Sequence, residues 1–385
     1  VSFIMLGSYI FYNTNILNKY WTNSQTTAFR VDYEKTLKEF EYLPQPKIVA
    51  VNLKVELYPK SRDYSAEGFY FLKNTYDTPI EEIHIQKLIE SNIALEAVSF
   101  EGGATVNNEY ATFDYNIYVL KQPLLAGDSI KMNFKQTFTT KGFEHGRSST
   151  NIVHNGTFFN NEDFPTLGYT KKYELQDDNE RDDYGLLPRS NKAGRDDAKE
   201  LVNSKSGGDS DGIQFEIILG TDESQTAIAP GNLIREWKEN DRNYFHYKMD
   251  IEMINFYSIV SAQYEVKKDT WLSKSDALAT PVDLEIYYHK EHDYNLDRMM
   301  QSMKTSFDYY STNFSPGTVP FSESIGFVLD INDEEDVDMA FYVTAHELAH
   351  QWFGMQVEAA NVQGRLMILE TLSQYAALMS LKQEY

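Results

Sequence analysis

Two histidines in the C-terminal part of the chain have the spacing of a metal site on a helix. The pentad His346-Glu347-Leu348-Ala349-His350 separates the imidazoles by four residues, so on a helix both can reach one ion. Glu347 points beside such an ion, which suits a general base acting on a metal-bound water. Zinc accepts nitrogen and oxygen ligands, keeps one position for water in catalytic sites and lowers the pKa of that water to about 7. The pentad therefore predicts a zinc hydrolase.

A third ligand is expected from a neighbouring helix. Glu370 is the candidate, because it is a carboxylate within the otherwise apolar run 366–372. A lone glutamate buried among apolar side chains is costly unless it is paired or bound to a metal. The competing interpretation of the pentad is a helix that happens to carry two core histidines.

The residues around the pentad indicate an α-rich domain, 280–385. Apolar side chains from Leu296 to Tyr310 recur at spacings of three and four, which predicts an amphipathic helix whose methionines fill the core. Further helices are expected at about 337–353 and 363–384. The second of these is apolar nearly all round, so we expect it to be buried.

The preceding part, 46–279, has the period of β-strands. Val51, Leu53, Val55 and Leu57 alternate with polar residues, and similar runs separated by turn residues follow along the chain. This pattern predicts a mostly antiparallel β domain. The stretch 176–212 is rich in Asp, Lys, Arg, Ser and Gly, so we expect it to be a long mobile loop. The predicted fold class is α+β and multidomain.

The first 45 residues differ from the rest. Residues 1–18 carry no charge and 1–12 are strongly apolar, which predicts the end of a transmembrane helix and hence a membrane-associated protein. The alternative is a buried helix or strand of a soluble protein. Residues 19–45 are polar and charged, and we expect them to form a stalk.

Composition excludes several classes of function. The 385 residues carry a net charge of −23, which argues against a nucleic-acid partner because phosphate binding needs a basic surface. The chain contains no cysteine, so a Cys-ligated metal, a disulfide scaffold and a thiol nucleophile are excluded.

Residues 346–354 (HELAHQWFG) resemble the signature of zinc aminopeptidases of the aminopeptidase N and leukotriene hydrolase type, and 370–375 (ETLSQY) match the family's next conserved segment. The resemblance implies one zinc ion held by His346, His350 and Glu370, and peptide substrates cleaved at their N-termini. It also implies a β-saddle domain followed by a thermolysin-like domain. Residues 361–364 (NVQG) and the apolar start are similar to the branch fused to bacterial ABC-transporter permeases, which makes transporter components possible partners.

The chain departs from this family in four places. Nineteen residues separate His350 from Glu370 where the family usually has eighteen, and we expect a one-residue bulge in the connecting loop. The family's G-A-M-E-N segment is replaced by residues 322–327 (SESIGF). Glu323 there is the candidate anchor for the substrate amine, or else an ordinary glutamate at a strand edge. Only residues 311–321 separate the methionine-rich helix from this segment, which leaves little room for another strand.

The last departure concerns the C-terminal end. The chain ends fifteen residues after Glu370, before the position of the family's transition-state tyrosine. We therefore expect an incomplete catalytic domain with little activity of its own. The alternative function is a non-catalytic module of a membrane transporter that binds peptides or partners.

Overall fold

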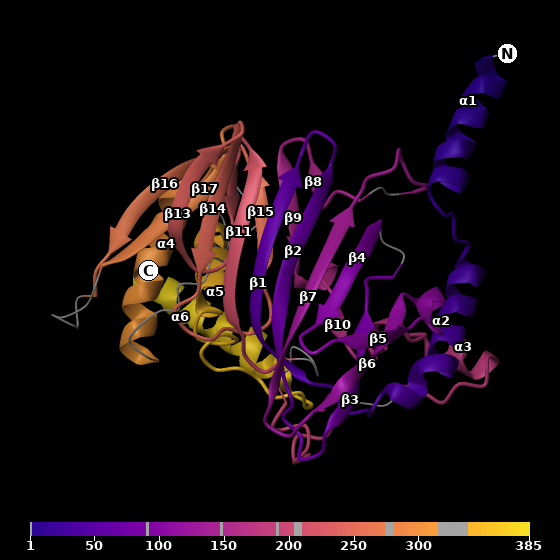
Figure 1. Ribbon diagram of the computed structural model, residues 1–385. Helices are drawn as coiled ribbons and strands as arrows, with labels where there is room; N and C mark the ends of the chain where they lie inside the picture. Colours follow the sequence, from indigo (N-terminus) through magenta and orange to yellow (C-terminus); the bar gives the residue numbers. More distant parts are fainter. Residues whose placement is uncertain are drawn as a thin grey trace.

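The computed structural model describes residues 2–89, 92–146, 149–189, 192–203, 210–273, 281–314 and 338–385. A large twisted sheet forms the centre of the molecule (Figure 1). Helices α4 (Leu296–Asn313), α5 (Met339–Ala349) and α6 (Leu372–Glu384) gather at one end, and α1 (Ser2–Phe11) projects at the other. The N-terminal part is thus sheet-rich and the C-terminal part helical, as the sequence predicts.

The central sheet has the strand order β13-β14-β11-β1-β2-β7-β4. Neighbouring strands are antiparallel except β1 and β11, which run parallel. Its strands are β1 (Lys47–Tyr58), β2 (Asp63–Lys73), β4 (Ile93–Phe100), β7 (Ser129–Phe138), β11 (Gln214–Asp222), β13 (Asn232–Glu239) and β14 (Arg242–Lys248).

Two smaller sheets complete the β-rich part, with orders β10-β3-β6-β5 and β12-β15-β9-β8. Their strands are β3 (Ile80–Gln86), β5 (Ala104–Asn107), β6 (Tyr115–Leu124), β8 (Ile152–Val153), β9 (Gly156–Asn160), β10 (Thr166–Leu167), β12 (Thr226–Ile228) and β15 (Ser258–Ala262). Short 3-10 turns lie at η2 (Lys38–Phe40), η3 (Ala111–Phe113), η4 (Asn161–Asp163) and η5 (Lys171–Tyr173).

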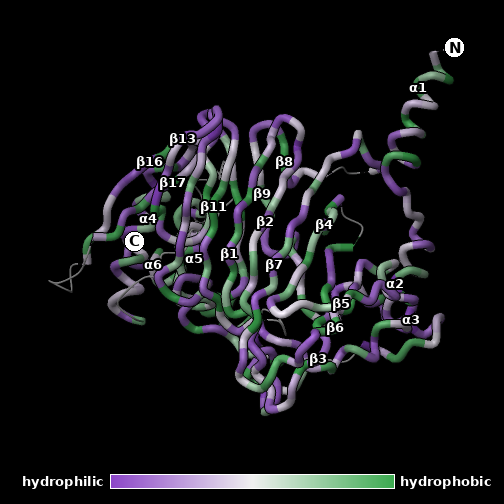
Figure 2. Tube along the Cα trace, in the orientation of Figure 1, coloured by the Kyte–Doolittle hydropathy of each residue, from purple (hydrophilic) through white to green (hydrophobic). Residues whose placement is uncertain are grey.

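One hydrophobic core joins these sheets. The alternation predicted for the first strand is present in β1, where Val51, Leu53, Val55 and Leu57 are at most 2% exposed and their neighbours are more exposed. Figure 2 shows the same alternation of colour along the strands of the sheet. Because successive side chains of a strand point to opposite faces, one face of the sheet supplies this core.

The helical part has its own core, which begins before the boundary predicted at residue 280. Strand β16 (Tyr264–Trp271) pairs with β17 (Val282–His289) across that boundary. Trp271 of β16 packs with Phe307 of α4, their ring centroids 5.0 Å apart. The hairpin therefore belongs to the packing unit of the helices. The predicted methionine-rich helix is α4, and Met299 and Met300 are buried as core residues.

Residues 19–45 are not a free stalk. They form α2 (Asn23–Leu37), whose Tyr33 and Leu37 are fully buried against Tyr115 and Ile117 of β6. Tyr33 and Leu37 have the helical spacing i, i+4. Charged residues such as Glu34 and Lys35 lie between them, so the sequence does not show a clear apolar face here.

Part of the stretch 176–212, expected to be a long mobile loop, is structured. It contains the short helix α3 (Asp178–Asp183), whose Arg181 forms a buried bidentate ion pair with Glu34 of α2, at 2.6 and 2.8 Å. A salt bridge that is almost fully buried ties its two elements firmly, because separating them would leave unpaired charges.

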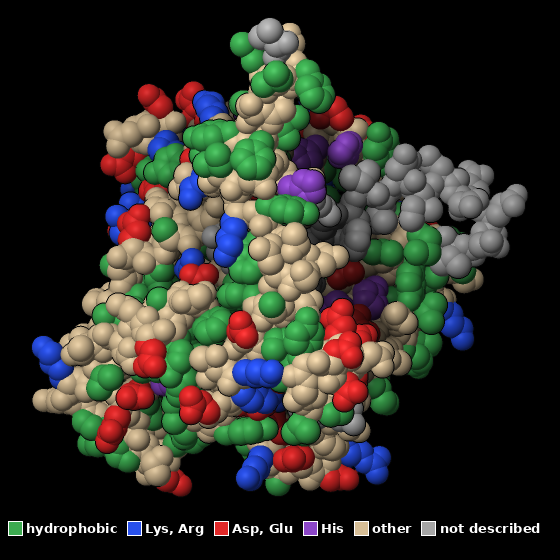
Figure 3. All heavy atoms as spheres, turned by 90° about the vertical axis from the view of Figure 1, so that its right-hand side faces the viewer, with side chains coloured by type: hydrophobic (Ala, Val, Ile, Leu, Met, Phe, Trp, Pro, Cys, Tyr) green, Lys and Arg blue, Asp and Glu red, His purple; other side chains and the backbone are tan. Residues whose placement is uncertain are grey.

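The N-terminal helix α1 is exposed along its length and continues into a π-helical segment, η1 (Tyr12–Leu17). Figure 3 shows apolar side chains around this projection at the top of the molecule. Among the described residues, no helix combines the length and apolar character needed to cross a bilayer.

Candidate metal centre

Helix α5 carries the pentad and is fixed by contacts on its opposite face. Asp338 caps its N-terminus by accepting a hydrogen bond from the Phe341 amide at 3.0 Å, and such a cap stabilises a helix by about 1 kcal/mol. Phe341 and Ala345 are fully buried. Tyr310 of α4 donates its hydroxyl proton to the Ala345 carbonyl at 2.8 Å. The helix ends at Ala349, four residues earlier than the predicted 353.

His346, His350 and Glu370 converge, as the sequence predicts. Glu370 Oε2 lies 3.5 Å from His346 Nε2 and 3.9 Å from His350 Nε2. The candidate ligand atoms of all three residues lie within 4.8 Å of one another. The two imidazole rings are nearly perpendicular, with centroids 4.9 Å apart.

The environment of His350 leaves its Nε2 atom free to bind a cation. His350 Nδ1 lies 3.1 Å from the Phe353 carbonyl oxygen and 3.2 Å from Ser373 Oγ. Since a carbonyl oxygen only accepts, Nδ1 carries a proton, and in the neutral imidazole Nε2 then has the lone pair. This is how outer hydrogen bonds orient the histidine ligands of metals. Ser373 is not among the residues predicted from the sequence, although it lies one turn after Glu370 and so on the same helical face.

His346 is held in its neutral form. Burial lowers the pKa of His346, and the neighbouring His350 lowers that pKa further, while Glu347 and Glu370 oppose both effects. A neutral imidazole is the form that binds a metal ion. Its Nδ1 atom is buried, and within the described ranges no group accepts or donates a hydrogen bond there.

Glu370 is more exposed than expected. Its side chain is 52% exposed, so the cost of burying a lone carboxylate does not apply to it, and its candidacy depends on convergence alone. Glu370 lies in a π-helical turn, η6 (Met367–Thr371), which precedes α6. A π turn takes one more residue than an α turn. Such a turn is one place where an extra residue can be accommodated, and the bulge expected in the connecting loop stays a prediction.

The expectation that the last helix is buried is wrong in part. Its small residues, Ser373, Ala376 and Ala377, are fully buried, whereas Leu366 and Leu378 are more than half exposed. Small side chains let α6 approach α4 and α5 closely, and Tyr375 and Leu378 project from its exposed face.

This set of atoms fits zinc. Two imidazole nitrogens and a carboxylate oxygen form a donor set found in catalytic zinc sites. Bonds of about 2.1 Å in a tetrahedron place ligand atoms roughly 3.4 Å apart, close to the 3.5 and 3.9 Å measured here. Three protein ligands leave one position for water. Zinc bound there would lower the pKa of that water and polarise a carbonyl group.

Two other predicted site residues have different outcomes. Glu347 is half-buried on α5 between the histidines, and its charge opposes the lowering of the His346 pKa. Glu323, the candidate amine anchor, lies outside the described residues.

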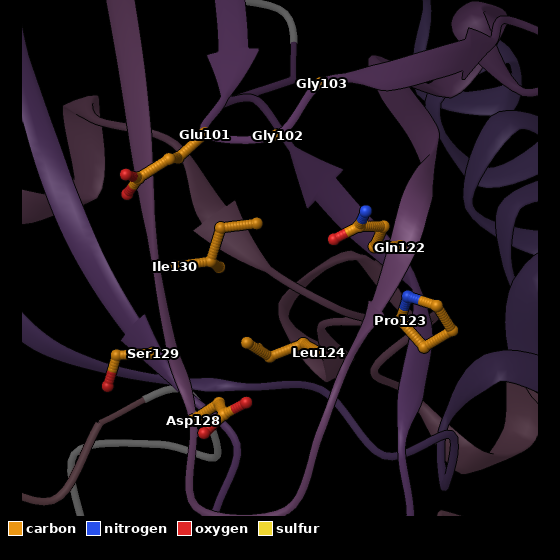
Figure 4. A pocket seen from close by; sticks show the side chains of 9 residues that line it. All are labelled: Glu101, Gly102, Gly103, Gln122, Pro123, Leu124, Asp128, Ser129 and Ile130. Atoms are coloured by element: carbon orange, nitrogen blue, oxygen red, sulfur yellow. The ribbon is translucent and has the colours of Figure 1, made fainter.

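A hollow of about 300 Å³ lies elsewhere, on the β-rich part (Figure 4). It is formed by the turn after β4 together with β6 and the start of β7, and Leu124 and Ile130 face it. All of its lining residues lie between positions 101 and 130. The hollow is therefore separate from the candidate metal centre.

The fold matches solved structures of M1 zinc metallopeptidases. A two-domain M1 zinc metallopeptidase mutant bound to L-tryptophan aligns with a TM-score of 0.56 at 13% identity, covering 88% of this chain and 72% of that one. The enzyme from Deinococcus radiodurans, as a mutant bound to a Tyr-Ser-Ala substrate, gives 0.54 at 13% identity, with the same coverage. No family model matches the chain, and no curated protein does. The chain therefore has a two-domain M1 peptidase-like fold.

Proposed function

We propose that this protein is a zinc-dependent metallopeptidase, and specifically an aminopeptidase. The convergence of His346, His350 and Glu370 carries the proposal, because it forms a zinc donor set with one open position. The fold shared with M1 zinc metallopeptidases supports it. In this proposal the β-rich part corresponds to a β-saddle domain and the helical part to a thermolysin-like catalytic domain.

The side chains have separate roles in the reaction. His346, His350 and Glu370 hold one zinc ion, and the Phe353 carbonyl and Ser373 orient His350. Glu347 takes a proton from the attacking water and delivers it to the leaving amine, a general base and then a general acid. Glu323 binds the free amino group of the peptide, which confines cleavage to the N-terminus.

Replacing Glu347 with Gln tests this mechanism. The substitution keeps the size of the side chain and removes the general base, so turnover of an aminoacyl chromogenic substrate should fall by roughly 10²–10⁴-fold. Zinc content, measured by atomic emission, should stay near one per chain. The companion variant His350→Ala should lose the zinc as well as the activity.

The two variants also separate the alternatives. Turnover that survives Glu347→Gln would refute the mechanism. A wild-type protein that binds zinc but cleaves no peptide would support the non-catalytic module of a transporter that binds peptides or partners. Absence of zinc from the wild-type protein would remove the basis of the metallopeptidase proposal.

We also propose that α1 contacts a lipid bilayer. Phe3, Ile4, Met5 and Leu6 are 62–89% exposed, and residues 1–18 carry no charge. The first charged side chain, Lys19, lies 3.6 Å from the centre of the Trp21 ring. Lysine and tryptophan at the end of an apolar segment are typical of a membrane interface. Association with ABC-transporter components follows from the motif resemblance and is part of this proposal.

Vesicle binding tests the membrane contact. The wild-type protein should sediment with phosphatidylcholine–phosphatidylglycerol vesicles, and a variant with Phe3, Leu6 and Ile10 replaced by glutamine should remain in the supernatant. These side chains are 47–89% exposed, so the substitutions should leave the folded body unchanged. Equal sedimentation of the two proteins would contradict the proposal.

A further inference from the structure

A segment of the β-rich part contacts the loop that leads to Glu370. This segment, residues 192–203, belongs to the stretch predicted as a loop, and it lies against residues 361–363 of the helical part. Two backbone hydrogen bonds join them: the Asn361 amide donates to the Asn203 carbonyl at 3.0 Å, and the Gln363 amide donates to the Ala193 carbonyl at 2.8 Å. The contact joins residues about 160 positions apart.

The side chain of Asn361 uses both of its polar ends in this contact. Its Nδ2 donates to Glu200 Oε2 at 2.7 Å, and its Oδ1 accepts from Lys192 Nζ at 2.6 Å. Gln363 adds a bond from Nε2 to the Lys192 carbonyl at 2.8 Å. The bond to Glu200 is partly buried and the bond to Lys192 is exposed to solvent. The Asn361 side chain therefore connects the loop to two residues of the segment, Lys192 and Glu200.

The loop passes directly into the turn that carries Glu370. Gly364 has φ 88°, a conformation that favours glycine. Its carbonyl accepts from the Met367 amide at 2.9 Å, and η6 begins at Met367. Nine positions separate Asn361 from Glu370, and a compact turn and a helical turn occupy most of them. A shift of residues 361–363 would thus move the start of η6.

The half-exposed state of Glu370 makes this support necessary. The side chains of His346 and His350 are only 14% and 15% exposed, and packing of α5 fixes them. Glu370 is 52% exposed, so few contacts of its own side chain hold it in place. Its direction depends on the backbone of η6, which is fixed on one side by α6 and on the other by the loop.

We propose that Asn361, together with Glu200 and Lys192, is a positioning residue for the third metal ligand, through which the β-rich part holds Glu370 toward the two histidines. This inference rests on the proposed zinc site. Residues that support metal ligands from outside the coordination sphere typically change metal affinity by 10–100-fold.

The test measures zinc affinity, by competition with a chromogenic chelator, in variants of the full chain. Asn361→Ala should weaken zinc binding by roughly 10-fold, the lower end of that range, because Asn361 acts through the backbone. Glu200→Ala should weaken it less, and Glu200→Gln should restore it, since the glutamine carbonyl still accepts from Asn361. Glu223→Ala, which changes an exposed residue of a β-turn, is the matched control and should bind zinc as the wild type does.

A double variant tests whether the residues act as a unit. Asn361→Ala combined with Glu200→Ala should bind zinc no more weakly than Asn361→Ala alone, because both remove the same contact. Unchanged affinity in Asn361→Ala, alongside the loss of zinc in His350→Ala, would overturn the positioning role and leave the proposed function intact. A wild type without zinc would overturn both. Should Asn361→Ala fail to fold, Glu200→Ala and its glutamine counterpart decide the question.

Discussion

The β-rich part and the helical part bury their apolar side chains in different ways. The sheets share one continuous core, from Ile48 in β1 to Ile259 in β15. The described helices instead enclose several small clusters, and Leu366, Met367 and Leu378 remain 54–63% exposed. Buried apolar area is the main source of stability. We therefore expect the β-rich part to be the more stable of the two, and the helices, packed with the β16–β17 hairpin and contacted by residues 192–203, to be the less stable.

The largest effect that follows from this comparison concerns Trp352. This side chain is 2% exposed, and its ring packs 5.1 Å from Tyr310 and 6.0 Å from Phe307. Trp352→Ala should destabilise the helical part by about 3–5 kcal/mol. In guanidinium denaturation followed by circular dichroism, an early loss of helix should separate from a later loss of sheet. A single unfolding transition that shifts to lower guanidinium concentration for helix and sheet together would show that the two parts unfold as a single unit.

A smaller effect, in the β-rich part, depends on pH. Burial raises the pKa of Asp163 from 3.8 to about 6, and hydrogen bonds partly offset the rise. The folded state therefore holds this proton more tightly than the unfolded state, so the stabilisation is complete below about pH 4 and is lost as the pH rises through 6. The difference of about two pKa units corresponds to at most about 3 kcal/mol.

Asp163→Asn tests this dependence. At pH 8 the variant should be more stable than the wild type by roughly 1–3 kcal/mol, and the difference should shrink toward pH 4. Thermal or urea denaturation at several pH values measures it. A constant difference across that range would show that Asp163 titrates in the same way in both states.

The smallest effect lies in the helical part, at Ser373. Removal of its hydroxyl in Ser373→Ala leaves the Phe353 carbonyl as the partner of His350 Nδ1. Zinc affinity should fall by less than about 10-fold, below the usual range for such contacts, because one of two partners remains. Chelator competition measures the change, and unfolding should be nearly unaffected. A loss as large as that of His350→Ala would mean that Ser373 alone orients the ring.

The candidate site was more predictable from the sequence than its supports. Because His346 and His350 are four residues apart, they lie on one face of any helix that contains them. The local sequence pattern was therefore enough to predict this pair. Tertiary contacts determine the exposure of Glu370 and the packing of Tyr33 and Leu37 in α2, and local pattern does not carry this information. The hydrogen bonds between residues 192–203 and Asn361 join parts of the chain that are far apart in the sequence. A local sequence pattern therefore could not predict them.

The π turn at Met367–Thr371 has a consequence for the rotational phase of the last helix. Each residue of an α-helix turns the chain by about 100°, so one extra residue rotates everything before the turn relative to everything after it. Arg365 and Leu366 belong to the helix before the turn, and Ser373 and Ala376 after it face the helical core. Without the extra residue, Leu366 would therefore point about 100° away from its present direction relative to Ser373 and Ala376.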